Sequence, residues 1–376
     1  MIDKTKMRAF VEVLIPGTQC NIKCHYCYLV QQNRRKMQKG LFNYDLETMI
    51  QAFGPERWGG VLYISLCGEG ETLLWKDLPE FTLALLKQGH YINITNNGTV
   101  TKAFERFYEI IPEELLHHLN FSFSYHPLEL ERIKRKDVFF ENVNNAKRHG
   151  CSILVQFNLS DGYLPLLDDI ERECLERTGA KPQVAATREL KEDKSWKLYT
   201  EGTTDEYIRA GKRFESPLFD FTMKNFNVKR KEFCYAGLYT YTLTLSDGHL
   251  RACYIEPVFQ NIFEDVNKPI LHKPVGCHCR DPYCINSSHF ISLGCIPTYK
   301  APTYADLRNR VCTDGKEWYT PEFKAFVSQK LYENNPTLSY MEQIKLNYLK
   351  SYDNLCYKIK SVLSRIFSQL LRCTKK

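Results

Sequence analysis

Short apolar runs alternate with longer, mostly polar segments over the first half of the chain. The apolar runs have the length and composition of buried strands, and they lie at Phe10–Ile15, Val61–Leu66, Tyr91–Thr95, Asn120–Tyr125, Ser152–Asn158 and Gln183–Ala186. The segments between them fit helices at Asp45–Ala52, Leu78–Gln88, Thr101–Tyr108, Leu128–His149 and Leu164–Thr178. Regular alternation of strand and helix is typical of parallel βαβ units. The pattern therefore predicts an α/β fold in which six units form a partial (β/α)6 TIM-like barrel, open on one side.

The pattern changes after about residue 190, which suggests a division of the chain into four parts. Residues 1–190 form the predicted barrel, and 191–232 form a charged and aromatic connector. Residues 233–320 are rich in cysteine and turns, and they contain a predicted hairpin around Gly248 with strands at Tyr239–Leu245 and His249–Tyr254. A helical tail is expected over 321–376.

Composition and charge narrow the function classes. The formal net charge is +7, which suits an anionic substrate but is too small to predict nucleic-acid binding. The first residues are polar and no run of 18 apolar residues occurs, so we expect a cytoplasmic protein. Because that compartment is reducing, the 15 cysteines are expected to bind metal or take part in catalysis rather than form disulfides.

Three cysteines directly follow the first predicted strand. Cys20, Cys24 and Cys27 have the spacing C-x3-C-x2-C, which allows one loop to wrap around a single metal centre. Thiolates are the usual ligands of iron–sulfur clusters, and a four-iron cluster held by three cysteines keeps one iron open for a ligand. A structural zinc site that uses the neighbouring His25 is the alternative.

This motif, its place after the first strand, and Tyr26 before the third cysteine resemble the radical S-adenosylmethionine (SAM) superfamily. The resemblance implies a [4Fe–4S] cluster whose open iron binds the amino and carboxylate groups of SAM. It also implies reductive cleavage of SAM to a 5′-deoxyadenosyl radical that abstracts a substrate hydrogen atom. Tyr26 is taken as a cofactor-binding residue on the same basis.

Three later segments resemble SAM-binding motifs of that superfamily, each directly after a predicted strand. Gly70 and Glu71 match the last Gly-Glu of a GGEP motif that holds the SAM amino group, although Thr72 replaces its proline. Asn97 corresponds to a residue near the SAM carboxylate or ribose, and Ser124 to a ribose contact. A plain β–α turn is the other interpretation of the first two segments. His126 is interpreted as a structural histidine, and a side chain that faces the substrate is the alternative.

A second group of cysteines follows the connector. Cys234, Gly248 and Cys253 have the spacing C-x13-G-x4-C, which resembles SPASM or twitch extensions that carry auxiliary [4Fe–4S] clusters. One arrangement is a single cluster held by Cys234, Cys253, Cys279 and Cys284. The other uses all seven cysteines for two clusters, adding Cys277, Cys295 and Cys312, and zinc in a small Cys-rich subdomain is a third possibility.

The end of the chain has the pattern of a basic amphipathic helix. From Leu355 to Lys376 apolar residues repeat at helical spacing, with six lysines and arginines and no acidic residue. Such a helix packs on its own domain, docks to a partner or lies on an anionic membrane surface.

The sequence thus predicts a radical SAM oxidoreductase, epimerase or lyase that modifies a peptide or small molecule. It would use a flavodoxin- or ferredoxin-type reductant and bind no nucleic acid. The alternatives are modification of a sugar or polysaccharide precursor by the same chemistry, and a metal-stabilised binding protein without catalytic activity.

Overall fold

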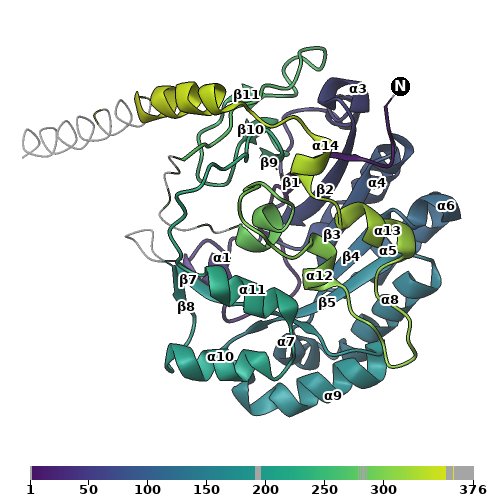
Figure 1. Cartoon of the computed structure of the whole chain (residues 1–376). Helices are drawn as coiled ribbons and strands as arrows, with labels where there is room; N and C mark the ends of the chain where they lie inside the picture. The colour runs from purple at the N-terminus through teal and green to yellow at the C-terminus, as the bar shows by residue number, and fades with distance from the viewer. Residues whose placement is uncertain are drawn as a thin grey trace, which may run out of the picture.

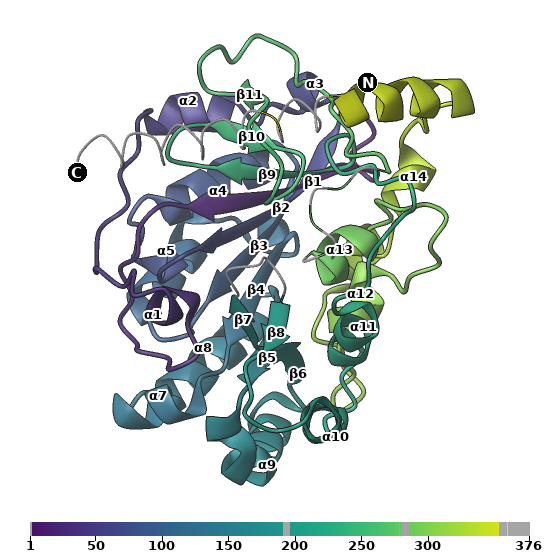
Figure 2. The ribbon, with the colours of Figure 1, turned by 90° about the vertical axis from the view of Figure 1, so that its left-hand side faces the viewer.

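Six parallel strands form the centre of the structure, which is a computed structural model that describes residues 2–190, 196–277, 279, 281, 284, 286–352 and 359. These strands are β1 (Met7–Ile15), β2 (Val61–Gly68), β3 (Tyr91–Asn96), β4 (Leu119–Ser124), β5 (Ser152–Leu159) and β6 (Gln183–Ala186). They lie side by side in chain order; Figure 1 labels β1 to β5, and Figure 2 labels all six. The predicted α/β fold with a parallel sheet, consistent with a partial barrel, is therefore confirmed.

Four helices cover the outer face of this sheet (Figure 2): α4 (Leu78–Lys87), α5 (Thr101–Ile110), α8 (Lys136–Arg148) and α9 (Leu167–Thr178). Aromatic side chains form much of the contact. The ring of Phe121 on β4 lies 5.1 Å from that of Phe104 and 5.3 Å from that of Phe107, both on α5. The shorter helices of this half of the chain are α1 (Tyr28–Gln31), α2 (Leu46–Gln51), α3 (Pro55–Trp58), α6 (Glu113–Leu116) and α7 (Pro127–Arg132).

Two predicted helices are each divided in the structure. The segment Leu128–His149 forms α7 and α8, because Lys134 takes a left-handed conformation (φ 55°) that closes α7 before α8 begins. The segment Leu164–Thr178 begins inside a 3₁₀ turn, η2 (Asp161–Leu166), and becomes α-helical only at Leu167. Pro165 lies in that turn and has no backbone N–H to donate to a longer α-helix.

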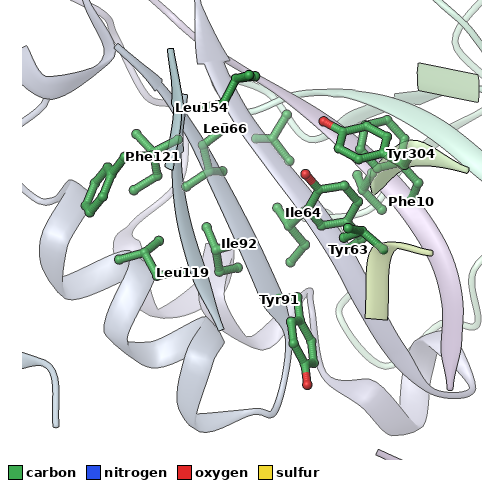
Figure 3. Close-up of a cluster of buried hydrophobic side chains, with 14 of the residues drawn as sticks. Phe10, Tyr63, Ile64, Leu66, Tyr91, Ile92, Leu119, Phe121, Leu154 and Tyr304 are labelled. Carbon is green, nitrogen blue, oxygen red and sulfur yellow. The ribbon is translucent and has the colours of Figure 1, made fainter. Parts of the chain in front are cut away.

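The C-terminal half of the chain closes the amino-terminal end of the sheet. Tyr63, near the start of β2, packs against Tyr304 of α12 (Tyr304–Arg308) at a ring distance of 5.2 Å. Tyr91, the first residue of β3, stacks on Phe326 of α13 (Pro321–Val327) at 3.7 Å. Figure 3 shows Tyr304 beside Phe10 and Tyr63. The loops after the carboxyl ends of the strands lie at the opposite end of the sheet.

The predicted hairpin around Gly248 is confirmed, and it belongs to the same sheet. Strands β9 (Thr240–Thr244) and β10 (His249–Arg251) pair in antiparallel fashion. Gly248 has φ 72°, a conformation that favours glycine. Strand β9 pairs in parallel with β1, and β11 (Gln260–Asn261) continues the sheet beyond β10.

The remaining described elements lie outside the main sheet and its outer helices. They are the antiparallel pair β7 (Arg188–Leu190) and β8 (Trp196–Leu198), helices α10 (Thr204–Lys212), α11 (Pro217–Asn225) and α14 (Leu331–Asn334), and a π-helical turn, η3 (Ser287–Ile291). Residues 340–352 are helical as well. The predicted basic helix from Leu355 onward lies, apart from residue 359, outside the described residues. Among the described residues, no helix has both the length and the apolar character needed to cross a membrane.

Candidate active site at the mouth of the barrel

The three N-terminal cysteines lie in a loop between β1 and α1 that is held from two sides. Arg35 donates hydrogen bonds to the carbonyl oxygens of Cys20 (3.4 Å) and Ile22. On the other side, a Glu129 carboxylate oxygen accepts a hydrogen bond from the backbone N–H of Lys23. Cys20, Cys24 and Cys27 all line one cavity of about 230 Å³ at the mouth of the barrel.

Burial makes two of these thiols weak acids. It raises the pKa of Cys20 to about 11 and that of Cys24 to about 12. Because a metal centre binds thiolates, its binding must displace these protons. The donor set of three cysteines around a shared cavity fits a multi-atom iron–sulfur cluster with one open iron.

His25 does not line this cavity. Its Nε2 lies 3.0 Å from the Ser160 hydroxyl, and its ring packs against Tyr163. Over the described residues, no three His, Cys, Asp or Glu side chains lie together as ligands of a single metal ion. The structure therefore does not bring His25 together with the three cysteines as a ligand.

The loop after β2 lies directly against the cysteine loop. The N–H of Gly70 donates to the carbonyl of Gly17 (3.1 Å), and the N–H of Glu71 donates to that of Gln19 (2.8 Å). A Cβ atom at Gly70 would lie 2.2 Å from the Gln19 oxygen, so only glycine allows this approach. These contacts place the Glu71 side chain beside Cys20.

The Glu71 carboxyl group is buried, with only 7% of the residue surface exposed. Its Oε1 accepts a hydrogen bond from the N–H of Leu73 (3.1 Å) and its Oε2 from that of Asn97 (2.9 Å). Burial raises the pKa of Glu71 to about 7, although both hydrogen bonds oppose the shift. A cationic ligand in the cavity would compensate for this desolvation and favour the ionised carboxylate.

Asn97 connects the loop after β3 to the cysteine loop. Its Nδ2 donates to Oδ1 of Asn21 (2.7 Å), a residue between Cys20 and Cys24. Its Oδ1 accepts from the Thr99 N–H and hydroxyl, and Asn21 in turn donates to that hydroxyl (2.7 Å). Asn97 thus braces the cysteine loop. Sequence reasoning missed Asn21 and Thr99, although the position of Asn21 inside the cysteine motif was a usable signal.

Tyr26, which is buried, and His126, which is half-buried, form a pair at the wall of the cavity. The Tyr26 hydroxyl lies 2.5 Å from Nδ1 of His126 and accepts a bond from Tyr163 (3.4 Å). Burial lowers the pKa of His126 to about 4, so its imidazole is neutral. This hydrogen-bonded pair agrees with a structural role for His126. Tyr26, Gly70, Glu71, Asn97 and Ser124 all line the same cavity as the three cysteines.

Six of the later cysteines gather around a second, smaller pocket of about 50 Å³. Its lining includes Cys234, Cys253, Cys277, Cys279, Cys284 and Cys295. Cys295 is buried and hydrogen-bonds to the Cys234 side chain, which lowers the pKa of Cys234. The four cysteines expected to hold one cluster are therefore neighbours, together with Cys277 and Cys295.

Cys312 does not belong to this group, so the arrangement that uses all seven cysteines is not formed. Its Sγ lies 3.5 Å from the carbonyl oxygen of Thr178, at the end of α9, and 3.7 Å from Nζ of Lys147. Long-range packing places Cys312 there. The residues that follow it pack against the start of β5, where the Ile153 N–H donates to the Trp318 carbonyl.

Comparison with known proteins finds a similarity in the first part of the chain. Residues 14–163 match the model of the radical SAM superfamily, a range that contains all three mouth loops. Over this range the chain is similar to radical SAM domains. A search of curated proteins found no match.

Several solved structures match the chain at low sequence identity. AnSMEcpe with bound AdoMet is 14% identical over 93% of this chain and 98% of that one, with a TM-score of 0.48. SuiB of Streptococcus suis bound to S-adenosylmethionine is 15% identical over 69% of this chain, with a TM-score of 0.48. The aligned region spans 64% of the length of SuiB. BtrN in complex with AdoMet and 2-DOIA is 15% identical over 69% of this chain and 80% of that one, with a TM-score of 0.38.

The contact between the two loops gives a testable prediction. Gly70→Ala forces the new methyl group against the Gln19 carbonyl, and we expect it to lower the free energy of unfolding by about 1–3 kcal/mol. The same variant should bind less iron on reconstitution, because the cysteine loop is displaced. Urea unfolding of the metal-free chain and an iron assay measure the two effects.

Gly202→Ala is the matched control, since its Cβ would meet only the ends of side chains at 3.3 Å or more. If Gly70→Ala unfolds like Gly202→Ala and binds iron as fully, the close approach of the two loops is not important.

Proposed function

We propose that this chain is a radical SAM enzyme. Cys20, Cys24 and Cys27 would hold its [4Fe–4S] cluster, and Glu71 would bind the ammonium group of SAM. The observation that carries the proposal is the shared cavity at the barrel mouth, where three thiols face a buried, incompletely compensated carboxyl group. A cluster ligand set and an ammonium receptor thus lie side by side.

The protein's own residues position and shield the reactants. When bound, the cluster and SAM would supply the one-electron chemistry that removes a hydrogen atom from the substrate. Arg35 and Glu129 fix the cysteine loop, and Asn97 ties it to the loop after β3. The Tyr26 ring, which is buried and bonded to His126, shields that side of the cavity from water.

The substrate would occupy a chamber inside the barrel, between the two cysteine sites. This chamber has a volume of about 160 Å³ and shares Thr95 and Ala186 with the cavity of the cysteine loop. It shares Cys284 with the pocket of the later cysteines. A volume of this size suits a small molecule or one side chain of a peptide, and these are the substrate classes that we propose.

The later cysteines would hold one auxiliary [4Fe–4S] cluster through Cys234, Cys253, Cys279 and Cys284. Thiolates are the natural ligands of such clusters, and all four side chains line the same pocket. Its place next to the chamber suits a one-electron relay between the substrate and the solvent side. A flavodoxin- or ferredoxin-type protein would supply the electrons, and the protein would act in the cytoplasm.

The role of Glu71 can be tested by SAM binding. Glu71→Gln keeps the shape of the side chain but removes the charge, so we expect the Kd for SAM to rise roughly tenfold to a hundredfold. Equilibrium dialysis of the reconstituted protein with labelled SAM measures this change. Glu109→Gln on the exposed face of α5 is the control, because Glu109 pairs at the surface with Arg106 and does not line the cavity. Equal affinities in the two variants would contradict the role of Glu71.

Anaerobic reconstitution tests the enzyme as a whole. We expect about eight irons per chain and reductive cleavage of SAM to 5′-deoxyadenosine. A Cys20/Cys24/Cys27→Ala variant should lose about four irons and all cleavage. A Cys151/Cys174/Cys312→Ala variant removes three buried thiols elsewhere and should keep both.

Other outcomes separate the parts of the proposal. About four irons with normal cleavage would remove the auxiliary cluster and keep the radical SAM site. Zinc in place of iron, with no cleavage, would leave a metal-stabilised binding protein.

A further inference from the structure

The chamber inside the barrel is polar and carries positive charge. Asn93, Ser122 and Gln156 reach it from the strands, and His289 reaches it from η3. Two cations, Arg188 and Arg308, also line it. No aspartate or glutamate is among the described residues that form its wall.

Arg308, the last residue of α12, is buried to an extent that is unusual for a charged side chain, with 2% of its surface exposed. Its Nη1 donates to the Ser288 carbonyl (2.8 Å), and its guanidinium lies 3.7 Å from the centre of the Tyr304 ring. In the described part of the chain, Arg308 forms no ion pair. A guanidinium has five N–H donors, and burying its charge without a carboxylate is costly.

Arg188 adds a second cation to the chamber. Its guanidinium lies 5.0 Å from the centre of the Trp196 ring, which also lines the wall. Both arginines influence His289: burial lowers the pKa of its imidazole well below the usual range, and the two positive charges lower it further. His289 is therefore a neutral hydrogen-bonding group beside two cations.

Glu12 on β1 is a described acidic group that interacts electrostatically with both arginines. Its Oε1 accepts from the Cys67 thiol (3.9 Å), the Tyr254 phenol lies beside it, and its Oε2 has no hydrogen-bond partner among the described residues. Burial raises the pKa of Glu12 to about 7, and Arg308 and Arg188 reduce that shift. Glu12 is thus only partly ionised near neutral pH and does not fully compensate the buried charge of Arg308.

We propose that the chamber binds an anionic group of the substrate, a carboxylate or a phosphate, with Arg308 as its main partner and Arg188 as the second. This inference rests on the proposed function, in which the chamber holds the substrate. The planar guanidinium fork matches the oxygen geometry of both anions. Because Thr95 and Ala186 line both cavities, a substrate fixed at Arg308 extends toward the SAM cavity.

Anion binding to the reconstituted full-length chain tests this site directly. Inorganic phosphate and sodium acetate are the two probes, each titrated at constant ionic strength against sodium chloride. The thermal unfolding midpoint should rise with the concentration of at least one probe and then level off, because a ligand of the folded state stabilises it. Saturation with phosphate alone indicates a phosphorylated substrate, and saturation with acetate alone indicates a carboxylate.

Variants locate the binding. Arg308→Gln should weaken the saturable response at least tenfold in probe concentration, whereas Arg308→Lys keeps the charge and should weaken it less. Arg188→Gln provides a second variant if Arg308→Gln fails to fold. Arg209→Gln on the exposed face of α10 is the control and should respond like the wild type.

Two results would overturn the inference. One is that neither probe gives a saturable response in the wild type; the other is that Arg308→Gln and Arg188→Gln both respond like Arg209→Gln. SAM cleavage by the same wild-type preparation separates the two levels of the account. If the protein cleaves SAM but binds no anion, the anion site is refuted and the proposed function stands. If it binds the anion but does not cleave SAM, the proposed function is refuted and the anion site stands.

Discussion

The candidate site depends on a close backbone contact between two loops at the barrel mouth. The segment before Cys20 accepts hydrogen bonds from Gly70 and Glu71, at an approach that a Cβ atom at Gly70 would prevent. That contact fixes the cysteine loop relative to the Glu71 carboxyl group. Asn97 holds the Glu71 carboxyl group and the cysteine loop together, since its backbone N–H donates to Glu71 and its side chain donates to Asn21. Thiols and carboxyl group keep their mutual positions only while these bonds are formed.

The aromatic packing of the outer layer and the polar interior have opposite effects on stability. Phe121 and its neighbours bury large apolar surfaces between the strands and α5, and this burial favours folding. Glu71, Glu12 and Arg308 are buried as well, and their charges are only partly compensated within the described chain. Ionisable groups in such surroundings are common at functional sites. Binding of SAM and an anionic substrate would supply the missing counter-charges.

The sequence predicted the barrel well because its signals are local. Apolar runs mark the six strands, and the cysteine motif and the Gly70-Glu71 pair are short patterns after such runs. The break between α7 and α8 was missed, since only a left-handed conformation at Lys134 marks it. Cys312 was grouped with the other late cysteines by proximity in sequence, whereas long-range packing places it at the end of α9. The residues next to Arg308 in the sequence do not indicate a functional role. Its importance follows from its burial and from the cavity that it lines, and both depend on the tertiary structure.

Mössbauer spectroscopy of ⁵⁷Fe-reconstituted protein tests the central claim most directly, that the cysteine loop leaves one iron open to SAM. A variant that lacks Cys234, Cys253, Cys279 and Cys284 simplifies the spectrum to the N-terminal cluster. The account predicts that SAM changes the isomer shift and quadrupole splitting of one iron in four, and that Glu71→Gln weakens this change. Four irons that remain unchanged at saturating SAM would contradict it.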